Sequence, residues 1–112
     1  MPIAVHDLEG GVTRVALSGR IDIFGAQEID MPMGIVAGSR RAVVIDLSGV
    51  SFIASMGLRC LVSAAKVVSR KQGRMVLLSP NANVEATFKT TGLDTMIPIF
   101  HDAGEAIRAV NQ

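Results

Sequence analysis

The feature that most constrains the fold is an uninterrupted apolar run, Ala42 to Ile45, which is followed by a turn and then by a helical pattern. The run contains three β-branched residues, which is typical of a strand covered on both faces of a sheet. Asp46 ends the run, and Ser48-Gly49 is turn chemistry. The stretch predicts a strand, a fixed loop and a helix that begins directly after Ser55. Three apolar side chains are expected to hold the loop against the core: Val50, Phe52 and Ile53.

The rest of the chain alternates strand and helix patterns. Two short strand patterns around a Glu-Gly-Gly turn predict an antiparallel hairpin at the start. The helix patterns carry apolar residues at spacings of three and four, which marks a core-facing stripe. The order ββαβαβαβα predicts an α/β fold, a small mixed β-sheet with helices packed against it, with residues 1–112 as one domain. The expected strands are 3–8, 12–17, 42–45, 74–78 and 97–100, and the expected helices are 24–39, 56–71, 81–91 and 101–110.

Three positions inside these elements carry expectations of their own. Pro32 lies within the first helix pattern and removes one backbone hydrogen bond, so we expect a kink there or a helix that starts late. Met31 is expected to fill the core as an ordinary apolar side chain. Ser79 directly before a proline predicts the N-cap of the third helix.

Composition narrows the class of protein. The 112 residues are 49% apolar, carry a formal net charge of +1 and include one cysteine, Cys60, which is expected to pack as a small apolar residue. No apolar run reaches the ~18 residues that a membrane span needs, and the first residues lack a signal-peptide pattern. No basic cluster is interleaved with aromatic residues, as nucleic-acid binding would favour. We therefore expect a cytoplasmic protein with neither a membrane nor a nucleic acid as partner.

The sequence also lacks the patterns of catalysis and metal binding. A serine hydrolase elbow reads Gly-x-Ser-x-Gly, but Ile53 stands at the first glycine position, and no motif ties His6 or His101 to Ser55. A phosphate-binding loop, the acidic pair of an aspartyl-phosphate receiver and metal-ligand spacing are all missing. The expectation is a protein that is not an enzyme and holds no cofactor and no metal.

One run of residues resembles a known family. Residues 46–58 read Asp-Leu-Ser-Gly-Val-Ser-Phe-Ile-Ala-Ser-Met-Gly-Leu. This is similar to the signature loop of the STAS domain in bacterial anti-sigma factor antagonists, roughly Asp-Leu-Ser-x-Val-x-Phe-Ile-Asp-Ser-Ser/Thr-Gly-Leu. The Gly-Arg-Ile-Asp step at 19–22 and the Gly-Leu turn at 92–93 also resemble that family. The chain departs from the pattern at two positions, since Ala54 replaces an Asp and Met56 replaces a Ser or Thr.

The resemblance implies a function and a site. It implies that Ser55 is phosphorylated by a partner kinase and that Asp22 lies near it. It further implies that the unphosphorylated chain binds an anti-sigma factor that is itself a serine kinase, which frees the sigma factor. A PP2C-type phosphatase would then reset Ser55. The residues expected to contact the partner are Asp22, Ala54, Met56, Gly57, Arg59 and Ser63.

Ser55 and Asp22 also have structural explanations, and the chain has alternative functions. A serine directly before a helix is often an N-cap, and spacing alone favours that role for Ser55, although a capping hydroxyl also remains accessible to a kinase. Asp22 is equally well explained as a turn or helix-capping residue. Ala54 and Met56 favour an alternative, a STAS module that is a scaffold or binding subunit of another regulatory or transport complex and is not phosphorylated. A further alternative is an enzyme accessory subunit that binds a small ligand.

Overall fold

The computed structural model describes residues 2–111, and this part of the chain contains five strands and four α-helices in the order predicted from the sequence. None of these helices is long and apolar enough to cross a membrane. The α/β class and the order ββαβαβαβα are confirmed. The elements are β1 Ile3–Asp7, η1 Glu9–Gly11, β2 Val12–Ile21, α1 Ile23–Ser39, β3 Ala42–Ile53, α2 Ser55–Arg70, β4 Arg74–Leu78, α3 Ala82–Thr91, η2 Leu93–Thr95, β5 Ile99–Phe100 and α4 Ala103–Val110.

The strands form one sheet in the order β1-β2-β3-β4-β5. β1 pairs antiparallel with β2, as the predicted hairpin requires, and the remaining neighbours are parallel. Parallel neighbours need a crossover connection, and α1, α2 and α3 supply the three that this sheet contains. The predicted mixed sheet is therefore confirmed, and β2 and β3 end side by side.

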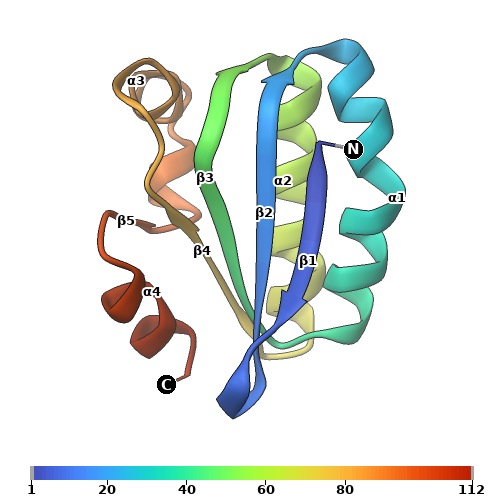
Figure 1. Ribbon diagram of the computed structural model, residues 1–112, viewed down its shortest axis with the longest axis vertical. Helices are drawn as coiled ribbons and strands as arrows, with labels where there is room; N and C mark the ends of the chain where they lie inside the picture. Colours follow the sequence, from blue (N-terminus) through green and yellow to red (C-terminus); the bar gives the residue numbers. More distant parts are fainter. Residues whose placement is uncertain (1, 112) are drawn as a thin grey trace.

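Helices cover both faces of the sheet (Figure 1). α1 and α2 lie on one face and share the larger core with α3, whereas α4 packs on the other face against β3 and β4. Successive side chains of a strand point to opposite faces, and β2 shows this, because Val15 and Leu17 belong to the first core and Val12 to the second. The face that α1 and α2 cover is the one that carries the candidate site.

β3 is longer than predicted and takes in the expected loop. The sequence places its end before Asp46, but the strand runs on to Ile53 because its pairing with β2 continues past Gly49. Two register shifts in this pairing absorb the extra backbone length of the turn residues. The segment before Ser55 is therefore held by a sheet rather than by side chains alone, which gives α2 a rigid starting point.

α1 is one helix of 17 residues with Pro32 inside it, and it begins at Ile23, so the predicted late start is wrong. Packing of its core-facing residues outweighs the hydrogen bond that proline removes. The prediction that Met31 fills the core is also wrong, because its side chain is 76% exposed. The buried stripe passes through Ile29 and Met33, which leaves Met31 on the opposite side of the helix.

The N-cap of α3 lies two residues later than predicted. Asn81 is the N-cap, and its side-chain oxygen accepts a hydrogen bond from the amide of Val84 at 2.8 Å. Ser79 instead takes a left-handed backbone conformation with φ of 55° and donates its amide to the carbonyl of Phe100 at 2.8 Å. The N-cap prediction for Ser79 is wrong because its backbone extends the pairing of β4 with β5.

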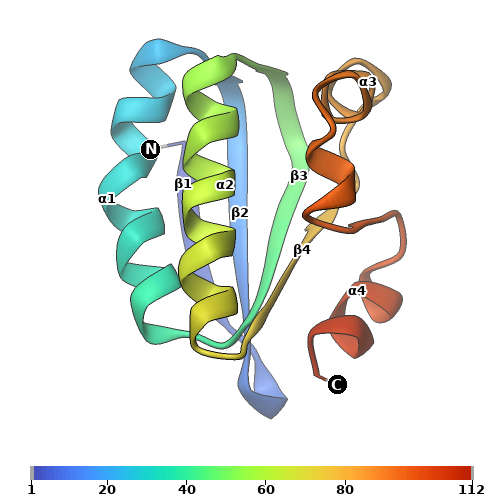
Figure 2. The same ribbon diagram turned by 180° about the vertical axis from the view of Figure 1, so that it is seen from behind.

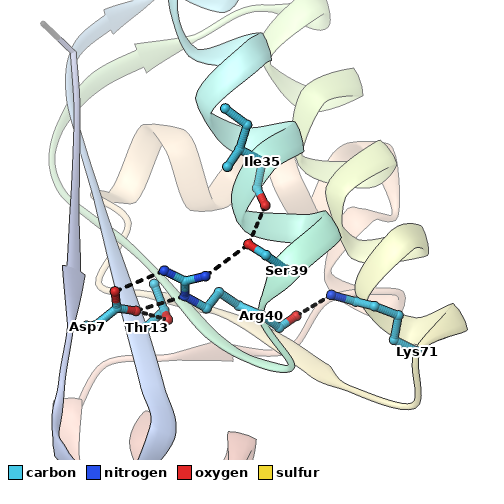
Figure 3. Close-up of polar contacts among 6 residues, drawn as sticks. All are labelled: Asp7, Thr13, Ile35, Ser39, Arg40 and Lys71. Carbon is cyan, nitrogen blue, oxygen red and sulfur yellow. Dashed lines mark hydrogen bonds and ion pairs between the residues drawn. The ribbon is translucent and has the colours of Figure 1, made fainter.

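A polar cluster fixes the end of the molecule at which α1 stops (Figure 3). Arg40 donates from Nε and Nη2 to the two carboxylate oxygens of Asp7, at 2.9 and 3.0 Å. Thr13 also donates to this carboxylate, at 2.7 Å. Lys71 donates from Nζ to the carbonyl of Arg40 at 2.8 Å. These bonds join β1, β2 and the ends of α1 and α2, and two of them are charge-assisted and bidentate.

Candidate functional site

The candidate site lies where β2 and β3 finish and α1 and α2 begin (Figure 2). Ile21 pairs with Ile53 in the parallel register, and each strand passes almost directly into its helix. The amide of Ala54 donates to the carbonyl of Ile21 at 2.9 Å, which fixes the start of α2 beside the end of β2. Two helix N-termini therefore lie side by side at the carboxyl ends of the strands, where α/β sheets usually bind their ligands.

Ser55 is the first residue of α2, and it is exposed. The N-cap position belongs to Ala54, which has an extended backbone and whose carbonyl accepts the amide of Leu58 at 3.1 Å. The N-cap interpretation of Ser55 is therefore wrong by one residue. Ser55 is therefore an exposed residue in the first turn of α2.

The first turn of α2 lacks a side-chain cap, unlike the other α-helices within residues 2–111. Asp22, Asn81 and Asp102 each accept a backbone N–H at the start of their own helices. An alanine at the N-cap of α2 cannot do so. Free N–H groups and the positive end of the helix dipole therefore lie beside Ser55, which favours a negative charge there.

Asp22 has a clear structural role in this arrangement. Its Oδ1 accepts hydrogen bonds from the amides of Phe24 at 3.1 Å and Gly25 at 2.9 Å, which confirms the helix-capping interpretation. The cap sits at the start of α1, at the same end of the sheet as the start of α2. Asp22 therefore fixes the start of α1 beside the site. The expected contact of Asp22 with a partner stays a prediction.

Gly57 lies beneath the site rather than on its surface. It is buried, and an added Cβ would lie 2.8 Å from Cγ2 of Ile21 and from Cγ1 of Ile53. These distances are too short for a stable contact, so the absence of a side chain lets α2 approach the ends of both strands. The sequence places Gly57 among the residues that touch a partner, whereas the structure gives it a packing role.

Exposed apolar side chains lie on the three elements, α1, β3 and α2, that meet at this end of the sheet. We call this set the apolar rim: Ile23 and Phe24 at the start of α1, Phe52 at the end of β3 and Met56 in α2. Phe24 is 71% exposed and Met56 is 40% exposed. Phe52 was expected in the core, but it is exposed and stacks with the guanidinium of Arg20, 4.4 Å from its ring centroid. Large apolar groups gathered at one place on a surface indicate a docking site.

The sequence predicted that Met56 is part of the site, but it did not predict Ile23, Phe24 or Phe52 there. A signal for Phe24 was available, because the core-facing stripe of α1 does not use it. No local pattern could have shown that Phe52 turns outward, since that depends on the register of β3 against β2.

A groove between α1 and α2 continues the site along both helices. Its volume is about 270 Å³, and it brings together Met56, Arg59 and Ser63, three of the residues expected to contact a partner. The thiol of Cys60 lies 3.6 Å from Oδ1 of Asp30 in this groove. Burial and the neighbouring carboxylate raise the pKa of Cys60, which keeps the thiol protonated and unreactive.

The STAS domain family matches residues 6–106. The anti-sigma-F factor antagonist RsfB of Mycobacterium tuberculosis is 33% identical over 105 residues, which cover 88% of this chain and 83% of that protein. A crystal structure of an anti-sigma factor antagonist from Mycobacterium paratuberculosis has a TM-score of 0.87 at 32% identity, covering 98% of this chain and 93% of that one.

A further solved structure shares the fold. Phosphorylated SpoIIAA, a Bacillus cell fate determinant, has a TM-score of 0.74 at 19% identity and covers 96% of this chain and 98% of its own. A five-stranded mixed sheet with helices on both faces places the protein among small α/β domains. The chain belongs to the STAS domain family, which confirms the resemblance seen in residues 46–58.

Proposed function

We propose that this protein is an anti-sigma factor antagonist, a binding module that captures an anti-sigma factor until Ser55 is phosphorylated. One observation carries the proposal: the exposed residue Ser55 begins a helix with no side-chain cap, at the end of the sheet where the residues of the apolar rim are also exposed. The name of RsfB, an anti-sigma-F factor antagonist, supports this class of partner. In this proposal the partner is a serine kinase, and a PP2C-type phosphatase restores the free hydroxyl.

The unphosphorylated surface suits an apolar partner. Burial of the apolar rim drives association, since each Å² of apolar area removed from water contributes about 25 cal/mol. Ala54 is small and uncharged, so it lets a partner approach the serine closely. Arg59 and Ser63 line the groove beyond the rim and offer polar contacts that orient the partner.

Phosphorylation changes this surface without requiring a new fold. A phosphoserine carries about −1.5 to −2 charges, and the free N–H groups and helix dipole at the start of α2 accommodate them. The partner, however, must then cover a dianion in an apolar setting. A buried charge without a counter-charge costs several kcal/mol, and each ~1.4 kcal/mol reduces affinity tenfold. The modification therefore releases the partner.

Phosphorylation is tested with the anti-sigma factor serine kinases encoded in the same genome. Each purified kinase is incubated with ATP and this protein, and intact mass is measured. We expect the addition of one phosphate to the wild-type chain and to Ser51→Ala, an exposed serine close by in β3, and none to Ser55→Ala. Phosphorylation of Ser55→Ala, or no modification of wild type by any kinase, contradicts the assigned site.

The two departures from the family pattern favour a second function. Ala54 lacks the carboxylate that would help a kinase to recognise the site, and Met56 places an apolar side chain, 40% exposed, next to Ser55. We propose as the alternative a STAS binding subunit that holds its partner constitutively, with Met56 as an anchor.

Two variants distinguish these functions, with affinity for the same purified kinases as the measurement. Constitutive binding predicts that Ser55→Asp leaves affinity nearly unchanged and that Met56→Asp weakens it. Switched binding predicts that Ser55→Asp alone weakens affinity more than tenfold, because it places a charge where the partner must remove water. The Ser55→Asp result therefore decides between them.

A further inference from the structure

The outer side of α1 carries an apolar stripe that its own fold does not use. At 100° per residue, Met31 and Ile35 lie within about 20° of the direction of Phe24, on one line along the helix. The three side chains are 71% (Phe24), 76% (Met31) and 64% (Ile35) exposed. We call them the outer stripe. The core-facing residues of α1 lie on the opposite side, so α1 is apolar on two faces. A helix with this pattern is normally covered on both.

The outer stripe is continuous with the candidate site. Phe24 belongs to both the apolar rim and the outer stripe, and the stripe extends from it for about 16 Å along α1. A stable protein interface buries about 800 Å² on each partner and uses 20–30 residues a side. The few side chains around Ser55 cannot supply that area, and α1 is the neighbouring apolar surface. One partner that covers both therefore accounts for the two features together.

The charge of α1 indicates which kind of molecule could cover the outer stripe. Residues 23–39 include Glu28 and Asp30 but no lysine or arginine, and no ion pair within residues 2–111 engages these two carboxylates. A second copy packed symmetrically, with α1 against α1, would bring the same carboxylates into that contact and no lysine or arginine from α1. An anionic lipid surface is disfavoured for the same reason. A protein surface with apolar residues and a nearby Lys or Arg is complementary.

We propose that the protein partner that docks at Ser55 also covers the outer stripe, with an apolar surface that places a Lys or Arg opposite Glu28. This inference rests on the proposed function and specifies the extent and chemistry of the partner surface. Contacts along α1 then contribute affinity, while Ser55 controls whether the complex forms at all. The partner is therefore held at two places on one continuous surface.

The test uses the anti-sigma factor serine kinases encoded in the same genome, with affinities measured by surface plasmon resonance for each one that binds wild type. We expect Met31→Lys combined with Ile35→Lys to weaken binding about tenfold or more. The matched control is Met96→Lys. Met96 is an exposed methionine next to η2 and lines a different groove, so this variant should bind the kinase with the affinity of wild type. Circular dichroism confirms that all variants are folded.

A charge reversal tests the chemistry of the partner. Glu28→Lys should weaken binding, and the loss should be larger at low ionic strength, where surface charges are less screened. Glu105→Lys, the same change at an exposed position in α4, should have no effect. An effect of Glu28→Lys equal to that of Glu105→Lys overturns the assignment of a cationic partner surface.

The outcomes separate this inference from the proposed function. If Met56→Asp weakens binding but the Met31 and Ile35 double variant binds like wild type, the inference is overturned and the proposed function stands. If no kinase binds wild type, both are overturned. Sedimentation equilibrium tests whether a second copy of the chain covers the outer stripe instead. If wild type self-associates and the double variant does not, the outer stripe is a dimer contact and the inference is overturned.

Discussion

Ala54 leaves the N-terminus of α2 without a side-chain cap. It occupies the N-cap of α2 and gives the first-turn amides no side-chain acceptor. Ala54→Asp supplies one and should raise the free energy of unfolding by about 0.5–2 kcal/mol, as measured by urea denaturation. Ala86→Asp makes the same change at an exposed position inside α3, where no free amides exist, and should give no gain. Equal effects at the two positions would contradict the capping argument.

Two helical glycines are expected to respond to alanine in opposite directions. A Cβ at Gly57 would lie 2.8 Å from two isoleucine side chains, whereas a Cβ at Gly34 meets nothing within 4 Å. Gly57→Ala should therefore reduce the free energy of unfolding by about 1–3 kcal/mol, because it pushes α2 away from the strands. Gly34→Ala should raise it by about 0.5–1 kcal/mol. Urea denaturation of both variants measures the difference, and a stabilised Gly57→Ala would disprove the close approach.

At the scale of elements, the sequence predicts what depends on local patterns. The order of strands and helices, the hairpin and the strand–helix junction at Ser55 all follow from periodicity and turn chemistry. The length of β3 and the cap of α3 do not, because each is decided by a partner elsewhere in the chain. The exposed position of Met31 does follow from helical periodicity, which places it opposite Ile29 and Met33. Pairing with β2 extends β3, and pairing with β5 takes Ser79 away from α3. Tertiary contacts outweigh local propensity at these places.

The ion pair between Asp7 in β1 and Arg40, the C-cap of α1, should make stability depend on pH. Hydrogen bonds from Arg40 and Thr13 lower the pKa of Asp7 from 3.8 to about 2. A carboxyl group with a lowered pKa stabilises the fold fully above its unfolded value and loses that contribution as pH falls through the folded value. The wild-type Tm should therefore fall faster than that of Asp7→Asn between pH 4 and about 2. Parallel Tm curves would contradict the linkage, and added salt should reduce the difference because Asp7 is exposed.

At the scale of the whole molecule, the proposed binding surface and the polar cluster of Arg40 and Asp7 lie at opposite ends of α1. The polar cluster ties β1, β2, α1 and α2 together where α1 stops, while the apolar rim lies where α1 begins. The parallel pairing of β2 and β3 connects the two ends. A partner therefore meets a surface that is already ordered, so little conformational entropy is lost on docking. Under the proposed function, a charge added at Ser55 would act on the partner without rearranging the fold.

This arrangement predicts that phosphorylation stabilises the free protein while it weakens the complex. A negative charge at the first turn of α2 interacts favourably with its free amides, so Ser55→Glu should raise the free energy of unfolding by about 0.3–1 kcal/mol. Ser63→Glu adds the same charge to the same helix beyond its first turn, where the dipole contributes little, and should give no such gain. Urea denaturation compares the two variants, and amide NMR spectra should show changes confined to the start of α2. A destabilised Ser55→Glu with widespread spectral changes would mean that the charge acts by disturbing the fold, and release of the partner would then need a different physical explanation.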